Sequence, residues 1–194
     1  MAKENKTKES RLVIATREHF IKRMAKGTPI HDWFPHHVRQ VEKWALKILD
    51  YYPNADKEVV LLSVWLHDVG HENKVNLATH EVFSEIETRR FFKSLRVSRE
   101  KTDKVAHCVR THRCKEDALP KSDEAKILAA ADSASHMTDT DYIHILNDGN
   151  SKEYVLNKLA RDIRDTQLLP QPLREQLIPL QSAWKELIKV FPEQ

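Results

Sequence analysis

Residues 59–71, VVLLSVWLHDVGH, join an apolar run to a histidine and an aspartate. The first eight residues contain one polar side chain, as in a helix that enters a protein core, yet His67 and Asp68 follow at its inner end. Moving a carboxylate out of water costs several kcal/mol unless it is paired, hydrogen-bonded or bound to a metal. We therefore expect a partner for Asp68 inside the fold.

Helical phase separates the histidines that point inward from those that face solvent. His37 is in phase with apolar residues four, seven, eight and eleven positions later, whereas His36 is in phase with polar residues. The same test on residues 105–113 turns His112 inward and His107 outward. Burial of His37 and His112 is therefore predicted from periodicity alone.

His67, Asp68 and Asp132 share this inward direction. The first two border the packed face of their helix, and Asp132 follows three alanines in the apolar run KILAAADSASHM. Each residue alone has an ordinary alternative, because an inward histidine is usually a hydrogen-bonded core residue and Asp132 could cap the following turn. Their joint occurrence with His37 on different helices predicts a site. Imidazoles and carboxylates together favour a divalent transition metal, with positions left for water.

The elements that must position these residues are helices. The chain of 194 residues has three glycines, 40% hydrophobic and 31% charged residues, and its apolar residues recur at helical spacing nearly throughout. No strand-like alternation persists. We predict an all-α protein with helices over residues 8–25, 35–51, 57–69, 80–95, 99–113, 123–136, 152–166 and 173–191.

Composition narrows the class of protein. No apolar run approaches the ~20 residues that span a bilayer, and the polar N-terminus is unlike a secretory signal, so we expect a cytoplasmic protein with no membrane partner. Cys108 and Cys114 are expected to be free thiols. Ten residues between 89 and 115 are Lys or Arg, which would either attract a phosphate-bearing partner or form a solvated helix face. The pattern indicates no specific nucleic-acid partner and leaves the oligomeric state open.

The order His37, His67-Asp68, Asp132 resembles the H…HD…D signature of the HD-domain superfamily of metal-dependent phosphohydrolases. The segment HDWFPHHVRQV is similar to the one around the first histidine of that family. The resemblance implies that these four residues bind a divalent metal: Mn, Fe, Ni, Co or Zn, with Mg as a further candidate.

The resemblance covers residues 31–137 and implies an HD-domain helical bundle with a C-terminal helical extension. We expect a single domain, residues 1–194, in which the helix over 8–25 and the helices within 152–191 pack on that core. His80 and His112 fall where some family members place extra histidines, which hold a second metal or contact phosphate.

Departures from known subfamilies limit the substrate. HDVGH lacks the HDxxED of guanosine tetraphosphate hydrolases and the HDIGK of cyclic-di-GMP phosphodiesterases, and ENKVNL replaces the continuation found in dGTP triphosphohydrolases. We expect hydrolysis of a nucleotide or another small phosphate ester or anhydride. The alternatives are a metal- or nucleotide-binding module without catalysis and a di-iron oxygenase on the same scaffold.

Roles can be assigned within this hypothesis. Asp68 would bind metal and orient the attacking water. His71, four residues after His67, is the candidate general acid or base if the helix continues through Gly70, and otherwise a loop residue. Glu72 is the second candidate for that role. The expected phosphate contacts are His80, His112 and Lys158, although a helical lysine is more often simply solvated.

Overall fold

The computed structural model describes residues 9–24, 34–72 and 79–192 and contains, within them, α-helices and no strand. The predicted all-α class is confirmed. The helices are α1 Arg11–Met24, α2 Phe34–Leu49, α3 Lys57–Leu66, α4 His80–Ser94, α5 Arg99–Thr111, α6 Asp123–Thr138, α7 Asp141–Asn147, α8 Lys152–Asp165 and α9 Gln171–Val190, with two short 3₁₀ turns, η1 Val69–Glu72 and η3 Thr166–Leu168.

Side-chain caps begin four of these helices where turn-forming residues stand in the sequence. Asp56 accepts hydrogen bonds from the backbone N–H groups of the first turn of α3, and Ser98, Ser122 and Ser151 do the same for α5, α6 and α8. α7 lies where no helix is predicted. Its seven residues are too few to show a helical period in the sequence.

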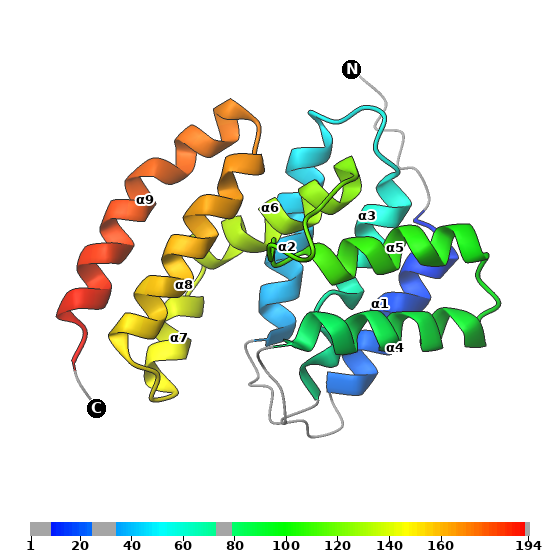
Figure 1. Ribbon diagram of the computed structural model, residues 1–194, viewed down its shortest axis with the longest axis horizontal. Helices are drawn as coiled ribbons and strands as arrows, with labels where there is room; N and C mark the ends of the chain where they lie inside the picture. The colour runs from blue at the N-terminus through cyan, green and yellow to red at the C-terminus, as the bar shows by residue number, and fades with distance from the viewer. Residues whose placement is uncertain (1–8, 25–33, 73–78, 193–194) are drawn as a thin grey trace, which may run out of the picture.

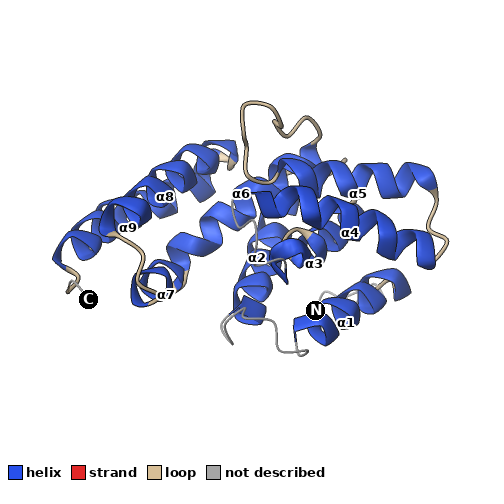
Figure 2. Ribbon diagram, turned by 60° about the horizontal axis from the view of Figure 1, so that its bottom comes forward, coloured by secondary structure: helices blue, strands red, loops and turns tan. Residues whose placement is uncertain are grey.

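The central helix is α6, whose residues 127–137 are all buried. It packs along α2 and also contacts α3, α5, α8 and α9. Figure 1 shows α6 and α2 between two sets of helices, with α1, α3, α4 and α5 on one side and α7, α8 and α9 on the other, and Figure 2 shows the same division from a second direction. The three alanines before Asp132 suit this crowded position, because small side chains let neighbouring backbones approach.

α3 explains the apolar run of residues 59–66. Its side chains from Val59 to Leu66 are all buried, and burial continues through His67 and Asp68. The helix ends at Leu66 rather than near residue 69, and His67 is its C-cap. Among the described residues, no helix has the length and hydropathy needed to cross a bilayer.

Candidate metal centre

The four residues of the expected signature come together from three helices. His37 comes from α2, Asp132 from α6, and His67 and Asp68 from the end of α3. The closest atoms are His37 Nε2 and Asp132 Oδ1 at 3.2 Å, and His67 Nε2 lies 3.3 Å from Asp68 Oδ2 and 3.6 Å from Asp132 Oδ1. His37 Nε2 lies 4.0 Å from Asp68 Oδ2. All four side chains are buried.

Helical phase correctly sorted the four tested histidines. The His37 side chain is 2% exposed, whereas its neighbour His36 is 56% exposed and pairs with Asp139. On α5, His107 is half-buried while His112, the residue that follows the helix, is buried. Both predicted orders of exposure are confirmed.

The other oxygen of Asp68 faces three further imidazoles. Asp68 Oδ1 lies 3.1 Å from His80 Nε2, 3.5 Å from His112 Nε2 and 3.6 Å from His71 Nε2. We call Asp68 with His71, His80 and His112 the Asp68 group. These three histidines were expected near phosphate or in catalysis, and they adjoin the signature residues.

Asp132 is likewise surrounded, and we call Asp132 with His37, His67 and His136 the Asp132 group. His136 Nε2 lies 3.5 Å from Asp132 Oδ1, and its Nδ1 lies 3.3 Å from Asp162 Oδ2 on α8. His136 is not among the residues predicted from the sequence, although its position four residues after Asp132 puts both side chains on one helix face.

Lys158 is not a solvated helical lysine. Its side chain is 17% exposed, and Nζ lies 3.4 Å from Asp162 Oδ2 and 3.0 Å from His136 Nδ1. Asp162 also accepts a 2.6 Å hydrogen bond from the Tyr142 hydroxyl. Lys158 therefore belongs to a polar network that adjoins the Asp132 group.

Local contacts orient the imidazoles. His67 Nδ1 lies 2.8 Å from the Val64 carbonyl, and His112 Nδ1 lies 2.7 Å from the Val109 carbonyl. A carbonyl only accepts, so both Nδ1 atoms carry protons and both Nε2 atoms face the carboxylates. Each histidine makes this contact with the last turn of its own helix, so the local fold sets the orientation.

The two groups hold protons differently. Burial alone lowers the pKa of His37, but the carboxylates of Asp141 and Asp132 outweigh it and raise the pKa to about 10. For His67, Asp68 and Asp132 likewise outweigh burial and raise the pKa well above its usual range. Burial and neighbouring imidazoles lower the pKa of His71 to about 3, and burial also lowers that of His112 despite Asp68.

The residues present fit a metal ion. Within the described chain, the buried atoms His67 Nε2, Asp68 Oδ1 and Asp132 Oδ1 form no hydrogen bond of regular geometry. Orphaned buried polar atoms are costly, and a cation would satisfy them. Among the described residues, three sets bring their potential ligand atoms within 4.8 Å of one another: His37 with His67 and Asp68, Asp68 with His80 and His112, and His37 with His136 and Asp141. Nitrogen and carboxylate donors suit Mn, Fe, Co, Ni or Zn.

A 3₁₀ turn, rather than a continued helix, places His71. η1 packs against α4 at Gly70, whose N–H donates a 2.9 Å hydrogen bond to Ser84 Oγ. A Cβ on Gly70 would lie 2.4 Å from Ser84 N and 2.6 Å from the His80 carbonyl oxygen. The close approach that glycine allows here brings His71 beside His80, with ring centroids 4.0 Å apart. The side chain of Glu72 lies outside the described part of the structure.

The basic segment is largely paired. Glu81, 1% exposed on α4, lies 2.6 Å from Lys115 Nζ, 3.1 Å from Arg113 Nη1 and 3.6 Å from Arg110 Nη1. Hydrogen bonds from Lys115, the backbone and Arg113 outweigh the effect of burial and lower the pKa of Glu81 to about 2. These contacts join α4 to the end of α5, next to His80 and His112. The three cations therefore help to hold in place the two helices that carry these histidines.

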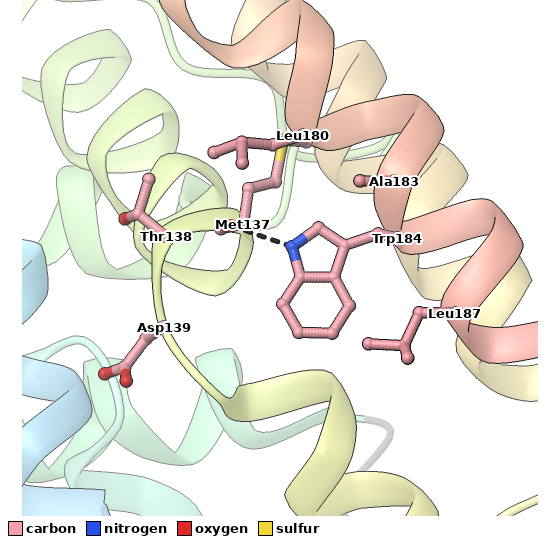
Figure 3. Close-up of a pocket in the computed structure, with 7 residues that line it drawn as sticks. All are labelled: Met137, Thr138, Asp139, Leu180, Ala183, Trp184 and Leu187. Carbon is pink, nitrogen blue, oxygen red and sulfur yellow. Dashed lines mark hydrogen bonds between the residues drawn. The ribbon is translucent and has the colours of Figure 1, made fainter.

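A separate apolar pocket of about 660 Å³ lies between the end of α6 and α9. Figure 3 shows the Trp184 side chain within it, with the indole N–H donating to the Met137 carbonyl at 2.8 Å. Its seven lining residues include one carboxylate, Asp139, and no imidazole. The candidate chemistry therefore belongs to the histidine and aspartate cluster.

A family model described as HD domain matches residues 36–137 of the chain. The match covers 102 of 194 residues and includes His37, His67, Asp68 and Asp132. No curated protein and no solved structure matched the chain. The matched segment ends before α7 begins at Asp141.

Proposed function

Because the chain belongs to the HD-domain family, we propose that it is a divalent-metal-dependent phosphohydrolase acting on a nucleotide or another small phosphate ester or anhydride. The observation that carries the proposal is the pair of buried carboxylates, Asp68 and Asp132, ringed by imidazole Nε2 atoms within 3.1 to 3.6 Å. Buried carboxylates with imidazoles and incomplete hydrogen bonding favour a cation site over a purely structural network.

In this proposal His37, His67, Asp68 and Asp132 hold the metal. A bound divalent cation supplies Lewis acidity, which polarises a phosphoryl oxygen and lowers the pKa of coordinated water. Asp68 has a second task, because its Oδ1 is turned toward His71 and His80. That oxygen can accept a hydrogen bond from the attacking water and orient it.

His71 is the proposed general base. Its side chain is 21% exposed, the most accessible of the three imidazoles around Asp68 Oδ1. Since its pKa is lowered to about 3, the ring is neutral at pH 7, and its unprotonated nitrogen can accept a hydrogen bond from the attacking water. The same value argues against His71 as the general acid.

His80, His112 and Lys158 are the proposed phosphate contacts. The first two lie across Asp68 from the Asp132 group, and Lys158 lies beyond His136 on the other side. A phosphate bound to a cation that Asp68 and Asp132 hold would lie between these side chains. Because Asp68 is shared by two of the three potential ligand sets, the arrangement also favours a second candidate function, the di-iron oxygenase.

Metal binding and turnover test these functions together. Protein stripped with a chelator is reloaded with Mn²⁺, Fe²⁺, Co²⁺, Ni²⁺, Zn²⁺ or Mg²⁺ and incubated with nucleoside mono-, di- and triphosphates and pyrophosphate. Metal-dependent phosphate release supports the proposal. Metal binding without release would favour the non-catalytic module, and oxygen consumption by a protein with two irons would favour the oxygenase.

A matched pair of variants locates the activity. His37→Ala removes a proposed ligand, whereas His36→Ala changes the adjacent exposed imidazole on the same helix. We expect the first to abolish release and the second to retain it. Equal activity of the two variants would exclude the His37 site.

A further inference from the structure

Helices α7 and α8 follow the matched segment in sequence, yet they supply carboxylates to the site. Asp141 on α7 is 2% exposed, and its Oδ2 lies 3.5 Å from His37 Nδ1. Asp162 on α8 is 5% exposed, and its Oδ2 lies 3.3 Å from His136 Nδ1. In both cases the Nε2 atom of the same ring faces Asp132 Oδ1.

Asp141 is buried with one carboxylate oxygen that lacks a hydrogen bond within the described part of the chain, which is unusual for a carboxylate that serves only the fold. Among the described residues, its buried Oδ2 forms no hydrogen bond of regular geometry. The Ser135 hydroxyl also lies near His37 Nδ1, at 3.3 Å, and it donates its own proton to the Asp132 carbonyl at 2.7 Å. Both Ser135 and Asp141 therefore offer an acceptor to His37 Nδ1, and of these two Asp141 carries the negative charge.

We propose that Asp141 is a positioning residue of the metal centre, which acts through His37, and that α7 is part of the functional unit although it lies outside the matched segment. This inference rests on the proposed metal binding by His37. A carboxylate behind a metal-binding imidazole keeps the proton on Nδ1, fixes the ring orientation and raises the basicity of Nε2. Asp162 also lies near an Nδ1 atom, that of His136, but there Lys158 Nζ is closer, at 3.0 Å.

The test compares Asp141→Asn with Asp165→Asn by isothermal titration of Zn²⁺ or Mn²⁺ into the full chain. Asp165 is 5% exposed on α8 but pairs with the Arg164 guanidinium, 2.7 Å away, and serves as the buried control. Loss of such a carboxylate weakens metal binding by about 10-fold to 100-fold. We expect that loss for Asp141→Asn and less than about threefold for Asp165→Asn.

Ser135→Ala distinguishes the two acceptors of His37. If the serine oxygen orients the ring, Ser135→Ala should weaken metal binding and Asp141→Asn should not, and that result would overturn the proposal. Melting temperatures of the metal-free variants show whether each is folded at the temperature of titration.

A measurement on the unmodified protein covers the case in which Asp141→Asn does not fold. In Zn²⁺-loaded protein labelled with ¹⁵N-histidine, long-range ¹H–¹⁵N spectra identify which ring nitrogen binds metal. We expect His37 to bind through Nε2, with a protonated Nδ1 that exchanges slowly with water. Binding through Nδ1 would contradict the proposal.

The outcomes separate this inference from the proposed function. Metal binding that is weakened by Asp141→Asn in a protein without phosphatase activity would support the inference and reject the hydrolase. Metal binding unaffected by Asp141→Asn in an active hydrolase would do the reverse. A wild-type protein that binds no divalent metal would overturn both.

Discussion

The Asp132 and Asp68 groups use the same residue types but hold protons in opposite ways. In the Asp132 group the pKa of His37 is raised to about 10, and Asp141 stands behind its ring. In the Asp68 group the pKa of His71 is lowered to about 3 and that of His112 is lowered as well. The imidazoles of the first group share several carboxylates, whereas those of the second share one.

This difference means that the two groups would take up metal under different conditions. Metal ligands must be deprotonated, so a cation entering the Asp132 group must displace protons from His37 and His67 at neutral pH. A cation entering the Asp68 group would meet neutral His71 and His112. Equal numbers of histidines therefore do not make equal sites.

The largest expected effect comes from removing Asp68, whose Oδ1 faces the imidazoles of its own group and whose Oδ2 lies near His37 and His67 of the Asp132 group. Asp68→Ala should reduce phosphate release about 10³-fold or more, because a metal ligand and the group that orients water are lost together. It should also remove most of the rise in melting temperature that Mn²⁺ or Ni²⁺ produces in the wild type. Asp103→Ala, on the exposed face of α5, is the control. Equal metal-induced shifts in wild type and Asp68→Ala would show that Asp68 is not a ligand.

The pH dependence of metal affinity should show which group is occupied. If the first ion binds in the Asp132 group, it must displace protons from histidine ligands. At a pH below the pKa of such a histidine, each displaced proton makes the metal affinity rise about tenfold per pH unit. We expect a rise between pH 7 and 9, measured by competition with a chelator of known affinity. An affinity that is constant over this interval would place the ion with the neutral imidazoles of the Asp68 group.

The metal-free protein should show the opposite slope. The folded-state pKa of His37 is about 10, above its ordinary value of 6.5. The protonated ring therefore stabilises the fold fully below pH 6.5, and this stabilisation is lost as pH rises toward 10. Urea unfolding at pH 7 and pH 9.5 in the presence of a chelator should give a lower free energy of unfolding at the higher pH. His37→Gln should flatten the difference.

Gly70→Ala should disturb the Asp68 group more than the Asp132 group. The added Cβ would overlap the backbone of α4, so we expect a loss of about 2–3 kcal/mol in the free energy of unfolding. Gly149→Ala is a useful contrast, because its cost comes from a positive φ of 83° with no neighbour within 4 Å. Metal titrations should find weaker binding only for the Gly70 variant. Unchanged stability of Gly70→Ala would contradict the close packing of η1 on α4.

The smallest expected effect is on substrate affinity and comes from Lys158, which adjoins the Asp132 group through His136. Lys158→Met should raise KM about fivefold, since a hydrogen bond to a charged group contributes about 1.5–3 kcal/mol and Asp162 already offsets part of the lysine charge. Lys126→Met, at a partly exposed position near the start of α6, should leave KM unchanged. A change in kcat with constant KM would assign Lys158 a role other than phosphate binding.

The helices and their inward faces could be read from the sequence because both depend on local spacing. The period of apolar residues marked His37 and His112 as buried, and an apolar run with no polar face required a partner for Asp68. Those features need only the backbone geometry of one helix at a time. The sequence alone therefore predicted the four signature residues and the all-α class.

What the tertiary structure decided were the partners of these residues. The packing of α7 and α8 on α6 places Asp141 near His37 Nδ1 and Asp162 near His136 Nδ1. No spacing in the sequence predicts those two contacts. The packing of Gly70 on α4 accompanies the position of His71 beside His80. The basic residues Arg110, Arg113 and Lys115 are paired because the fold brings them to Glu81, which lies about 30 residues earlier in the sequence. Each is an electrostatic or steric contact between separate elements, whose strength depends on distances that exist only once the helices have packed.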